Sequence, residues 1–405
     1  MRKRSILTAI DVGTTKVCTT IAEANDEGTI RVAGVGVTPS HGLHKGLVVN
    51  ISDAKESIRE SVRRAEQSSG YKVESAYIGV TGRHVSSINN RGVVAITHSD
   101  RLVRPYDLKR VLTSAQSIKI PSDRKLLHVI PRTYAVDGQP GVKNPVGMHG
   151  FRLDVETHVI TAAVTSVQNL VKCIRSIGID IEDLVLEPLA SSEAVLTADE
   201  KEVGIILADI GGGTTDIAVF KDGSIWHTAI LPVAGYQLTR DVAIGLGLPF
   251  DVAEEMKKRY GTVMPVYEAK METATAISED GHGVSYQDLC DIIRARVEEI
   301  VRLILLELPR SDYETLVPAG LVLTGGTSNL SGIDALGRDI LQLPVRVGIP
   351  ADIEGITDTL RDPAYATSVG LLLWGTKNEG KRSWKSGIFG GAVRRLASQF
   401  RNLFH

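Results

Sequence analysis

Apolar residues in this chain gather in short runs that flank two turns rich in glycine and threonine. Residues 5–10 and 17–21 surround the first turn, and residues 203–208 and 217–220 surround the second. Short apolar runs on either side of a tight turn predict a β-hairpin. The two turns have related sequences although they lie almost two hundred residues apart. This similarity indicates an internal repeat with one hairpin in each half of the chain.

The first turn reads Asp-Val-Gly-Thr-Thr-Lys and the second reads Asp-Ile-Gly-Gly-Gly-Thr-Thr. We expect the glycines to supply positive φ angles and to let backbone N–H groups approach an anion closely. Either turn alone is equally well explained by local turn geometry. Two facing hairpins, however, can hold a triphosphate from both sides. The candidate phosphate-binding residues are Gly13, Thr14, Thr15, Lys16, Gly211, Gly212, Gly213, Thr214 and Thr215.

An aspartate precedes each turn at the end of an expected strand. Asp11 and Asp209 therefore point into the same proposed cleft. Carboxylates suit Mg²⁺, which keeps several of its waters and bridges protein to phosphate. Lys16 adds a positive point charge for the phosphates. We predict a magnesium site at Asp11 and Asp209.

The remaining pattern alternates between strand-like and helical segments. We expect strands at 30–37, 77–80 and 321–323, and helices at 52–68, 167–176, 189–196, 236–245, 251–260 and 289–308. Ser52 is the expected cap of the first helix. Residues 85–160 depart from this alternation. They predict short strands, a helix at 106–117 and a Pro/Gly-rich loop at 138–150, which indicates a small α+β insertion.

The strand at 321–323 ends in a glycine turn that gives a second kind of candidate site. Gly325, Gly326 and Thr327 can let a flat base or its sugar lie against the backbone. Glu254 and Lys257 share one face of a helix because they are three residues apart. They either hold ribose and base edges or form an ordinary exposed ion pair.

Composition limits the possible functions. The chain has 405 residues, which indicates more than one domain, and a hydrophobic fraction of 43% with 23% charged residues is typical of a folded protein. A net charge of −2 gives no reason to expect nucleic acid as a partner. Three scattered cysteines indicate a reducing compartment. We expect neither a signal peptide nor a transmembrane helix, and therefore a cytoplasmic body.

The last residues have a distinct pattern. Residues 377–391 are rich in Lys, Gly and Ser and are expected to be a linker. Residues 392–405 predict a short amphipathic helix, either lying in a membrane surface or docked on the protein's own core. Its expected apolar face holds Val393, Leu396, Phe400, Leu403 and Phe404. Its expected basic face holds Arg394, Arg395 and Arg401, which would attract anionic lipids.

Two connecting segments complete a known pattern. The segments are residues 187–192 (Glu-Pro-Leu-Ala-Ser-Ser) and 363–370 (Pro-Ala-Tyr-Ala-Thr-Ser-Val-Gly). With the two hairpins and the glycine turn, the chain resembles the superfamily of actin, heat-shock chaperones and sugar kinases over about residues 5–376. The resemblance implies an α/β, actin-like, two-lobed ATPase fold with duplicated ribonuclease-H-like halves and ATP with Mg²⁺ in the cleft. It places Glu187 where some relatives position the attacking water. A purely structural glutamate before proline is the other interpretation.

The insertion carries a narrower resemblance. Residues 128–137, 143–148 and 158–161 are similar to the extra subdomain of FtsA, the bacterial cell-division actin homologue. This resemblance implies an ATP-binding protein that polymerises on the inner face of the cytoplasmic membrane at the division septum. It implies that the protein tethers the FtsZ ring through the terminal helix, binds FtsZ through about residues 226–309, and recruits later division proteins. Hydrolysis is expected to be slow or incidental.

The resemblance also divides the chain and leaves other functions open. The expected parts are a first lobe core at 1–84 and 161–202, the inserted subdomain at 85–160, a second lobe core at 203–225 and 310–376, its outer subdomain at 226–309, the linker at 377–391 and the terminal helix at 392–405. The alternatives are a type IV pilus-assembly ATPase, a soluble enzyme similar to sugar kinases, and a heat-shock chaperone. A sugar kinase or a pilus-assembly ATPase gives no reason for the amphipathic terminal segment. A chaperone would need a β-rich substrate-binding domain after the ATPase, and only about thirty residues follow Gly375.

Overall fold

The fold was obtained as a computed structural model that describes residues 5–25, 29–265, 275–277, 283–308, 316–351 and 353–378. The predicted terminal helix at 392–405 lies outside the described residues, as does the predicted linker beyond Asn378.

Two β-sheets of the same plan form the body of the molecule. The first has the order β11-β6-β1-β2-β3-β19 and the second has the order β14-β13-β12-β17-β18. In each, three antiparallel strands are followed by strands that run parallel to the first of them. The first sheet contains β1 (Ser5–Val12), β2 (Lys16–Ala24), β3 (Ile30–Pro39), β6 (Ser75–Val80), β11 (Asp180–Leu186) and β19 (Ile353–Gly355). The second contains β12 (Ile205–Ile210), β13 (Thr215–Lys221), β14 (Ser224–Leu231), β17 (Leu321–Thr324) and β18 (Val345–Val347). The repeat predicted from the two turns is confirmed at the level of whole sheets.

Helix α1 (Ile51–Ser69) shows how the sequence pattern becomes packing. Buried Ala54, Ile58, Val62 and Ala65 lie at helical spacing on the face that packs on β3. The N-cap is Asn50, whose side-chain oxygen accepts from the N–H groups of residues 52 and 53. The prediction of Ser52 as the cap was wrong because Asn50, two residues earlier, satisfies the first free N–H groups.

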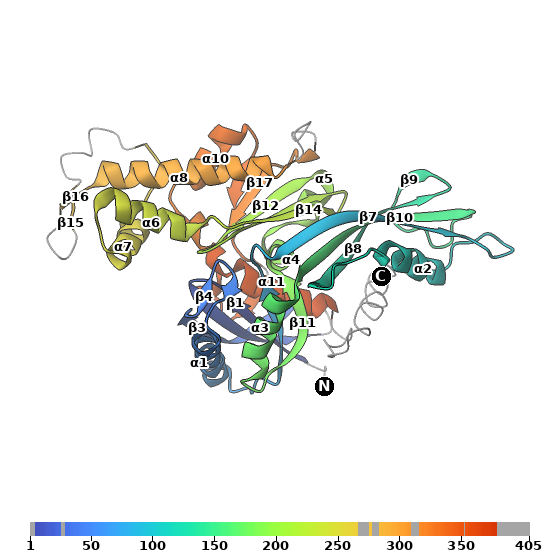
Figure 1. The fold of residues 1–405 in the computed structure, drawn as a ribbon, viewed down its shortest axis with the longest axis horizontal. Helices are drawn as coiled ribbons and strands as arrows, with labels where there is room; N and C mark the ends of the chain where they lie inside the picture. The colour runs from blue at the N-terminus through green and yellow to red at the C-terminus, as the bar shows by residue number, and fades with distance from the viewer. Residues whose placement is uncertain are drawn as a thin grey trace.

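Two connector helices cross between the lobes (Figure 1). Helix α4 (Glu187–Val195) packs against α11 (Ala366–Asn378) so closely that a Cβ on Gly370 would lie 1.9 Å from the carbonyl oxygen of Ala190. Only glycine permits this approach. The other described helices of the two lobes are α3 (Val164–Arg175), α5 (Ala198–Val203), α6 (Gly235–Leu246), α7 (Phe250–Tyr260), α8 (Tyr286–Leu306) and α10 (Ile333–Leu341). The single-turn 3₁₀ segments are η2 (Gly326–Asn329), η3 (Asp358–Leu360) and η4 (Pro363–Tyr365).

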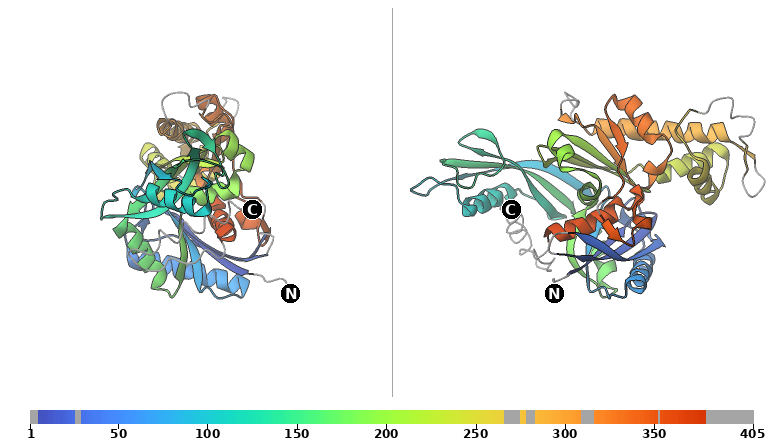
Figure 2. Two further views of the ribbon diagram at one scale, coloured as in Figure 1. Left: turned by 90° about the vertical axis from the view of Figure 1, so that its right-hand side faces the viewer. Right: turned by 180° about the vertical axis from the view of Figure 1, so that it is seen from behind.

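The α+β insertion is a separate antiparallel sheet with its own core. Its order is β7-β10-β8-β9, formed by β7 (Val85–Ala95), β10 (Arg152–Ala163), β8 (Arg124–Val136) and β9 (Gln139–Val142). Helix α2 (Pro105–Gln116) covers one face and buries Leu108, Val111 and Leu112. The loop predicted at 138–150 contains the short strand β9. In Figure 1 this subdomain and the helices α6–α8 lie at opposite ends of the long axis, and Figure 2 shows the same separation from behind.

The insertion also contacts the edge of the second sheet. Ser87 donates a hydrogen bond to the carbonyl of Thr228 on β14 at 3.0 Å, and Ser224 donates to the carbonyl of Pro131 at 2.8 Å. The Arg132 guanidinium lies over the Trp226 ring, 4.0 Å from its centroid. The inserted sheet, which lies between β6 and α3 in the chain, therefore also contacts the second lobe. Two further short hairpins, β4 (Leu43–His44) with β5 (Leu47–Val48) and β15 (Thr275–Ile277) with β16 (Gly283–Ser285), complete the described strands.

Candidate functional site

The tips of the two predicted hairpins meet in the folded chain. A Cβ on Gly212 would lie 2.3 Å from Thr15 Cγ2, and a Cβ on Gly213 would lie 2.5 Å from Thr14 Oγ1. Gly212 and Gly213 therefore leave room for the first turn, whereas a Cβ on Gly13 or Gly211 would lie 2.9 or 3.3 Å from a carbonyl oxygen of its own turn. The expectation that the turn glycines supply positive φ was wrong, because none of the four has a positive φ. They are instead positions where a side chain lacks space, at Gly212 and Gly213 because of the opposite turn.

Asp11 and Asp209 lie at the ends of β1 and β12 and are both buried. Ser368 Oγ donates to Asp11 Oδ2 at 2.9 Å. Ser191 Oγ and Thr367 Oγ1 donate to Asp209 Oδ2 at 2.5 and 3.1 Å. The three hydroxyls come from the connector helices α4 and α11, so the connectors hold both carboxyl groups in place.

Burial raises the pKa of both aspartates, and the charge of Asp209 adds to the rise at Asp11. A bound cation would offset the repulsion between these buried carboxylates. Among the described residues no three His, Cys, Asp or Glu side chains are grouped so that they alone could hold a metal. Two hard oxygen donors without a third protein ligand fit Mg²⁺, which is commonly completed by water and phosphate oxygens.

Asp216 is a third carboxyl group of this site that the sequence analysis did not assign. It lies on β13 directly opposite Asp209 in the antiparallel register. Thr214 Oγ1 donates to Asp216 Oδ2 at 2.8 Å, and Thr81, the residue after β6, donates to the other oxygen. Burial and the charges of Asp209 and Asp11 raise its pKa to about 7. The available signal was its position at the end of the second turn, seven residues after Asp209.

Glu187 is the first residue of α4 and lies beneath β6. A Cβ on Gly79 would be 3.3 Å from its Oε1 atom. Burial and then the charges of Asp11, Asp216 and Asp209 raise the pKa of Glu187 well above its ordinary value, although Lys16 opposes them. The predicted water-positioning residue is therefore close to the three aspartates, and their charges favour the protonated form of its carboxyl group.

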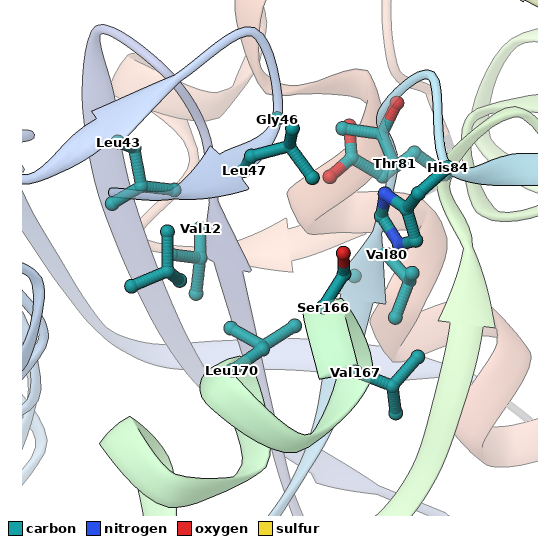
Figure 3. Close-up of a pocket in the computed structure, with 13 residues that line it drawn as sticks. Val12, Leu43, Gly46, Leu47, Val80, Thr81, His84, Ser166, Val167 and Leu170 are labelled. Atoms are coloured by element: carbon teal, nitrogen blue, oxygen red, sulfur yellow. The ribbon is translucent and has the colours of Figure 1, made fainter. Parts of the chain in front are cut away.

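A pocket opens beside Glu187 (Figure 3). Figure 3 shows Leu43, Gly46 and Leu47 on one wall and Ser166, Val167 and Leu170 of α3 on the opposite wall. Both ring nitrogens of His84 are buried there, and neither has a hydrogen-bond partner in the described part of the chain. Burial, assisted by the charge of Arg124, lowers the pKa of His84 to about 4, so the ring is neutral near neutral pH. The pocket's other lining residues are Val12, Val48, Gly79, Val80, Thr81 and Glu187.

Lys16 reaches the second connector. Its Nζ atom donates to the carbonyl of Ala364 at 2.5 Å and lies 4.6 Å from the centroid of the Tyr365 ring. The positive charge of the same ammonium partly opposes the rise in the pKa values of Asp11, Asp209 and Glu187. Lys16 is therefore the cation that faces the carboxyl cluster.

The glycine turn after β17 closes the other side of the site. Gly325 has φ +84°, and a Cβ there would lie 2.4 Å from Asp209 Oδ1. Here the glycine is required both for a left-handed backbone and for space. Thr327 Oγ1 donates to the carbonyl of Gly211 at 2.9 Å, which ties this turn to the second hairpin. Gly326 begins the 3₁₀ turn η2.

Glu254 and Lys257 form the expected ion pair, but in a partly buried network. Lys257 Nζ lies 2.6 Å from Glu254 Oε2 and donates to Thr239 Oγ1 at 2.9 Å and to the carbonyl of Gly235 at 3.3 Å. Its side chain is only 12% exposed. Because the N–H of Gly235 donates to Gly211, the pair lies beside the second hairpin.

Within the described residues, no helix is long and apolar enough to cross a bilayer. The predicted membrane-binding residues, from Val393 to Phe404, lie outside the described residues.

The fold defines the class of protein. The structure of a PilM–PilN type IV pilus biogenesis complex aligns with a TM-score of 0.66 and 17% identity, covering 93% of this chain and 99% of that one. MreB5 of Spiroplasma citri bound to AMPPNP aligns with a TM-score of 0.52 and 14% identity, covering 93% and 96%. The chain therefore has the actin-like α/β fold. At these identities the likeness shows the fold alone.

The sequence comparisons identify the family. The family "Cell division protein FtsA" matches residues 206–370, and "SHS2 domain inserted in FTSA" matches residues 82–161. The chain is 44% identical to the cell division protein FtsA of Pseudomonas aeruginosa over 92% of its own length and 90% of the relative's. The chain belongs to the FtsA family of cell-division proteins. The family and the fold expected from the sequence motifs are confirmed.

Proposed function

We propose that this chain binds ATP with Mg²⁺ between its lobes and uses the bound nucleotide to hold a polymer-forming conformation. The observation that carries the proposal is the meeting of two glycine-threonine turns above buried Asp11 and Asp209. Bound Mg²⁺ supplies positive charge that relieves the repulsion among the carboxyl groups. The turn residues 13–16 and 211–215 surround the phosphates, and the turn at 325–327, with Glu254 and Lys257, holds the adenosine.

Hydrolysis is proposed to be slow and secondary to scaffolding. A glutamate orients an attacking water best as an ionised acceptor. Glu187 instead has a raised pKa because it is buried among three aspartates. If the pKa of Glu187 stays raised with Mg-ATP bound, the protonated carboxyl group would activate water poorly.

The scaffold is proposed to act at the cytoplasmic face of the cell membrane at the division septum. Membership of the FtsA family supports FtsZ as a partner through about residues 226–309, with recruitment of later division proteins. The inserted subdomain and α6–α8 lie at opposite ends of the molecule (Figure 1), which suits head-to-tail contacts in a filament of identical copies. The amphipathic pattern of residues 392–405 supports attachment to anionic lipid.

The test is co-sedimentation of the full chain with anionic vesicles, with and without Mg-ATP. A deletion of residues 392–405 and the substitution Asp209→Asn are compared with it. We expect the deletion to remove vesicle binding and retain ATP binding, and Asp209→Asn to remove ATP binding and retain a folded body. Unchanged sedimentation of the deletion would refute the membrane anchor. Normal nucleotide affinity of Asp209→Asn would refute the phosphate site.

A further inference from the structure

The small hairpin β4–β5 lies against both phosphate turns. Its two-residue tip is Lys45-Gly46, with φ values of 49° and 73°. The N–H of Gly46 donates to Thr14 Oγ1 at 3.2 Å. On the other side, a Cβ on Gly213 would lie 3.0 Å from Lys45 Cα. One tip therefore contacts the first and the second nucleotide hairpin together.

The same tip is held from behind by the start of the inserted subdomain. A Cβ on Gly46 would lie 2.9 Å from Gly82 Cα and 3.1 Å from the carbonyl carbon of Thr81. Thr81 in turn donates its hydroxyl hydrogen to Asp216. The tip therefore packs on the backbone of Thr81 and Gly82, and the Thr81 side chain is hydrogen-bonded to Asp216. This packing fixes the position of the Lys45 backbone.

Lys45 is a partly buried cation without an anion. It forms neither a hydrogen bond nor an ion pair with any residue in the described part of the chain. Lys16, the other lysine at the two turns, already faces the carboxyl cluster and donates to Ala364. The tip that touches both turns therefore carries a positive charge that no anion of the described residues compensates, and an anion bound between the turns would compensate it.

We propose that the β4–β5 hairpin is a third nucleotide-binding loop and that Lys45 binds the terminal phosphate of ATP. The proposal rests on the proposed function, because it requires a triphosphate between the two glycine-threonine turns. Lysine suits this place because its ammonium carries three donors and acts as a point charge on phosphate oxygens. A diphosphate lacks the group that Lys45 would contact, so the residue discriminates ATP from ADP.

The experiment measures binding of Mg-AMPPNP and Mg-ADP to the full chain by isothermal titration calorimetry. Lys45→Met retains the length of the side chain and the cost of the left-handed backbone while removing the charge. Lys45→Arg retains the charge. Lys109→Met, at an exposed position on α2, is the matched control.

For Lys45→Met we expect the affinity for AMPPNP to fall by roughly tenfold or more, the effect of losing one charge-assisted hydrogen bond. Affinity for ADP should change by less than about twofold, Lys45→Arg should recover most of the AMPPNP affinity, and Lys109→Met should match the unsubstituted chain. Equal affinities of Lys45→Met and the unsubstituted chain for AMPPNP, or equal losses for both nucleotides, would overturn the inference and leave the proposed function intact. Failure of the unsubstituted chain to bind either nucleotide would overturn both.

Discussion

Replacing Asp216 by asparagine should stabilise the nucleotide-free protein above neutral pH. Asp216 is 3% exposed, and burial together with the charges of Asp209 and Asp11 raises its pKa from 3.8 to about 7. In the unfolded chain the carboxyl group ionises with its ordinary pKa. Keeping it ionised in the folded protein therefore costs free energy that a neutral amide of similar shape does not incur.

The size of this cost follows from the two pKa values. At about 1.4 kcal/mol per pKa unit, the difference between 3.8 and about 7 corresponds to roughly 4 kcal/mol. Asparagine accepts one of the hydroxyl hydrogen bonds from Thr81 and Thr214 and must present its amide to the other hydroxyl, which costs about 1–2 kcal/mol. The expected net gain is about 2–3 kcal/mol.

The pH dependence has a definite sign. Below about pH 4 the Asp216 carboxyl is protonated in both states, so the folded aspartate protein incurs no charge cost. As pH rises, the unfolded state loses its proton first, and the aspartate protein loses stability until the folded carboxyl ionises near pH 7. The advantage of the asparagine variant should therefore grow between about pH 4 and pH 7 and stay constant above that.

The assay is urea unfolding in EDTA over this pH range, comparing the unsubstituted chain with Asp216→Asn. Asp222→Asn is the matched control, because Asp222 is exposed at a turn and its φ of 54° suits asparagine equally well. An Asp216→Asn advantage that does not rise with pH, or a variant less stable at pH 8, would refute the reasoning. Adding Mg²⁺ with ATP should favour the unsubstituted chain, because the cation then compensates the charge.

Two further predictions concern the frame around the site. His158 is buried between Asn89 and Thr228, and desolvation, assisted by the nearby charges of His227 and Arg132, lowers its pKa to about 3. The free energy of unfolding should therefore fall as pH drops below about 6.5, by up to about 1.4 kcal/mol per pH unit. In urea unfolding, His158→Gln should reduce this dependence on pH. The same pH dependence in the variant and the unsubstituted chain would contradict the role given to His158. Gly370→Ala should lower the free energy of unfolding by about 3 kcal/mol or more, because its Cβ would meet the carbonyl of Ala190. Gly245→Ala should leave the free energy of unfolding nearly unchanged, because its Cβ would meet only the movable side chain of Ile292. Equal stabilities of the two alanine variants would show that the connector helices can separate.

Several features of the site could be predicted from the residues alone. The turns, with Asp11 and Asp209 before them, are local patterns, since strand-turn-strand geometry depends on neighbours in sequence. The insertion and its helix at 106–117 were predicted for the same reason and are present as α2 within a separate sheet. The helix cap was misassigned to Ser52 because Asn50 and Ser52 are both suitable capping residues and only the backbone geometry selects one.

The positions of Asp216, Thr81 and Lys45 could not be predicted in this way. Asp216 and Thr81 are 135 residues apart in sequence, and their hydrogen bond exists only because the two lobes face one another. The reason for glycine at positions 212 and 213 also depended on tertiary contact, since a Cβ there would meet Thr15 and Thr14 of the opposite turn.

The sequence by itself determined the two glycine-threonine turns and their repetition, the family and the terminal amphipathic pattern, because each can be seen in short stretches of residues. Only the tertiary structure decided the electrostatics. The burial of Asp11, Asp209, Asp216 and Glu187 in one cluster raises all four pKa values, and this effect depends on distances between segments that the sequence does not contain. It also decided which other segment meets the two turns, because the packing of β4–β5 brings the backbone of Lys45 and Gly46 against both.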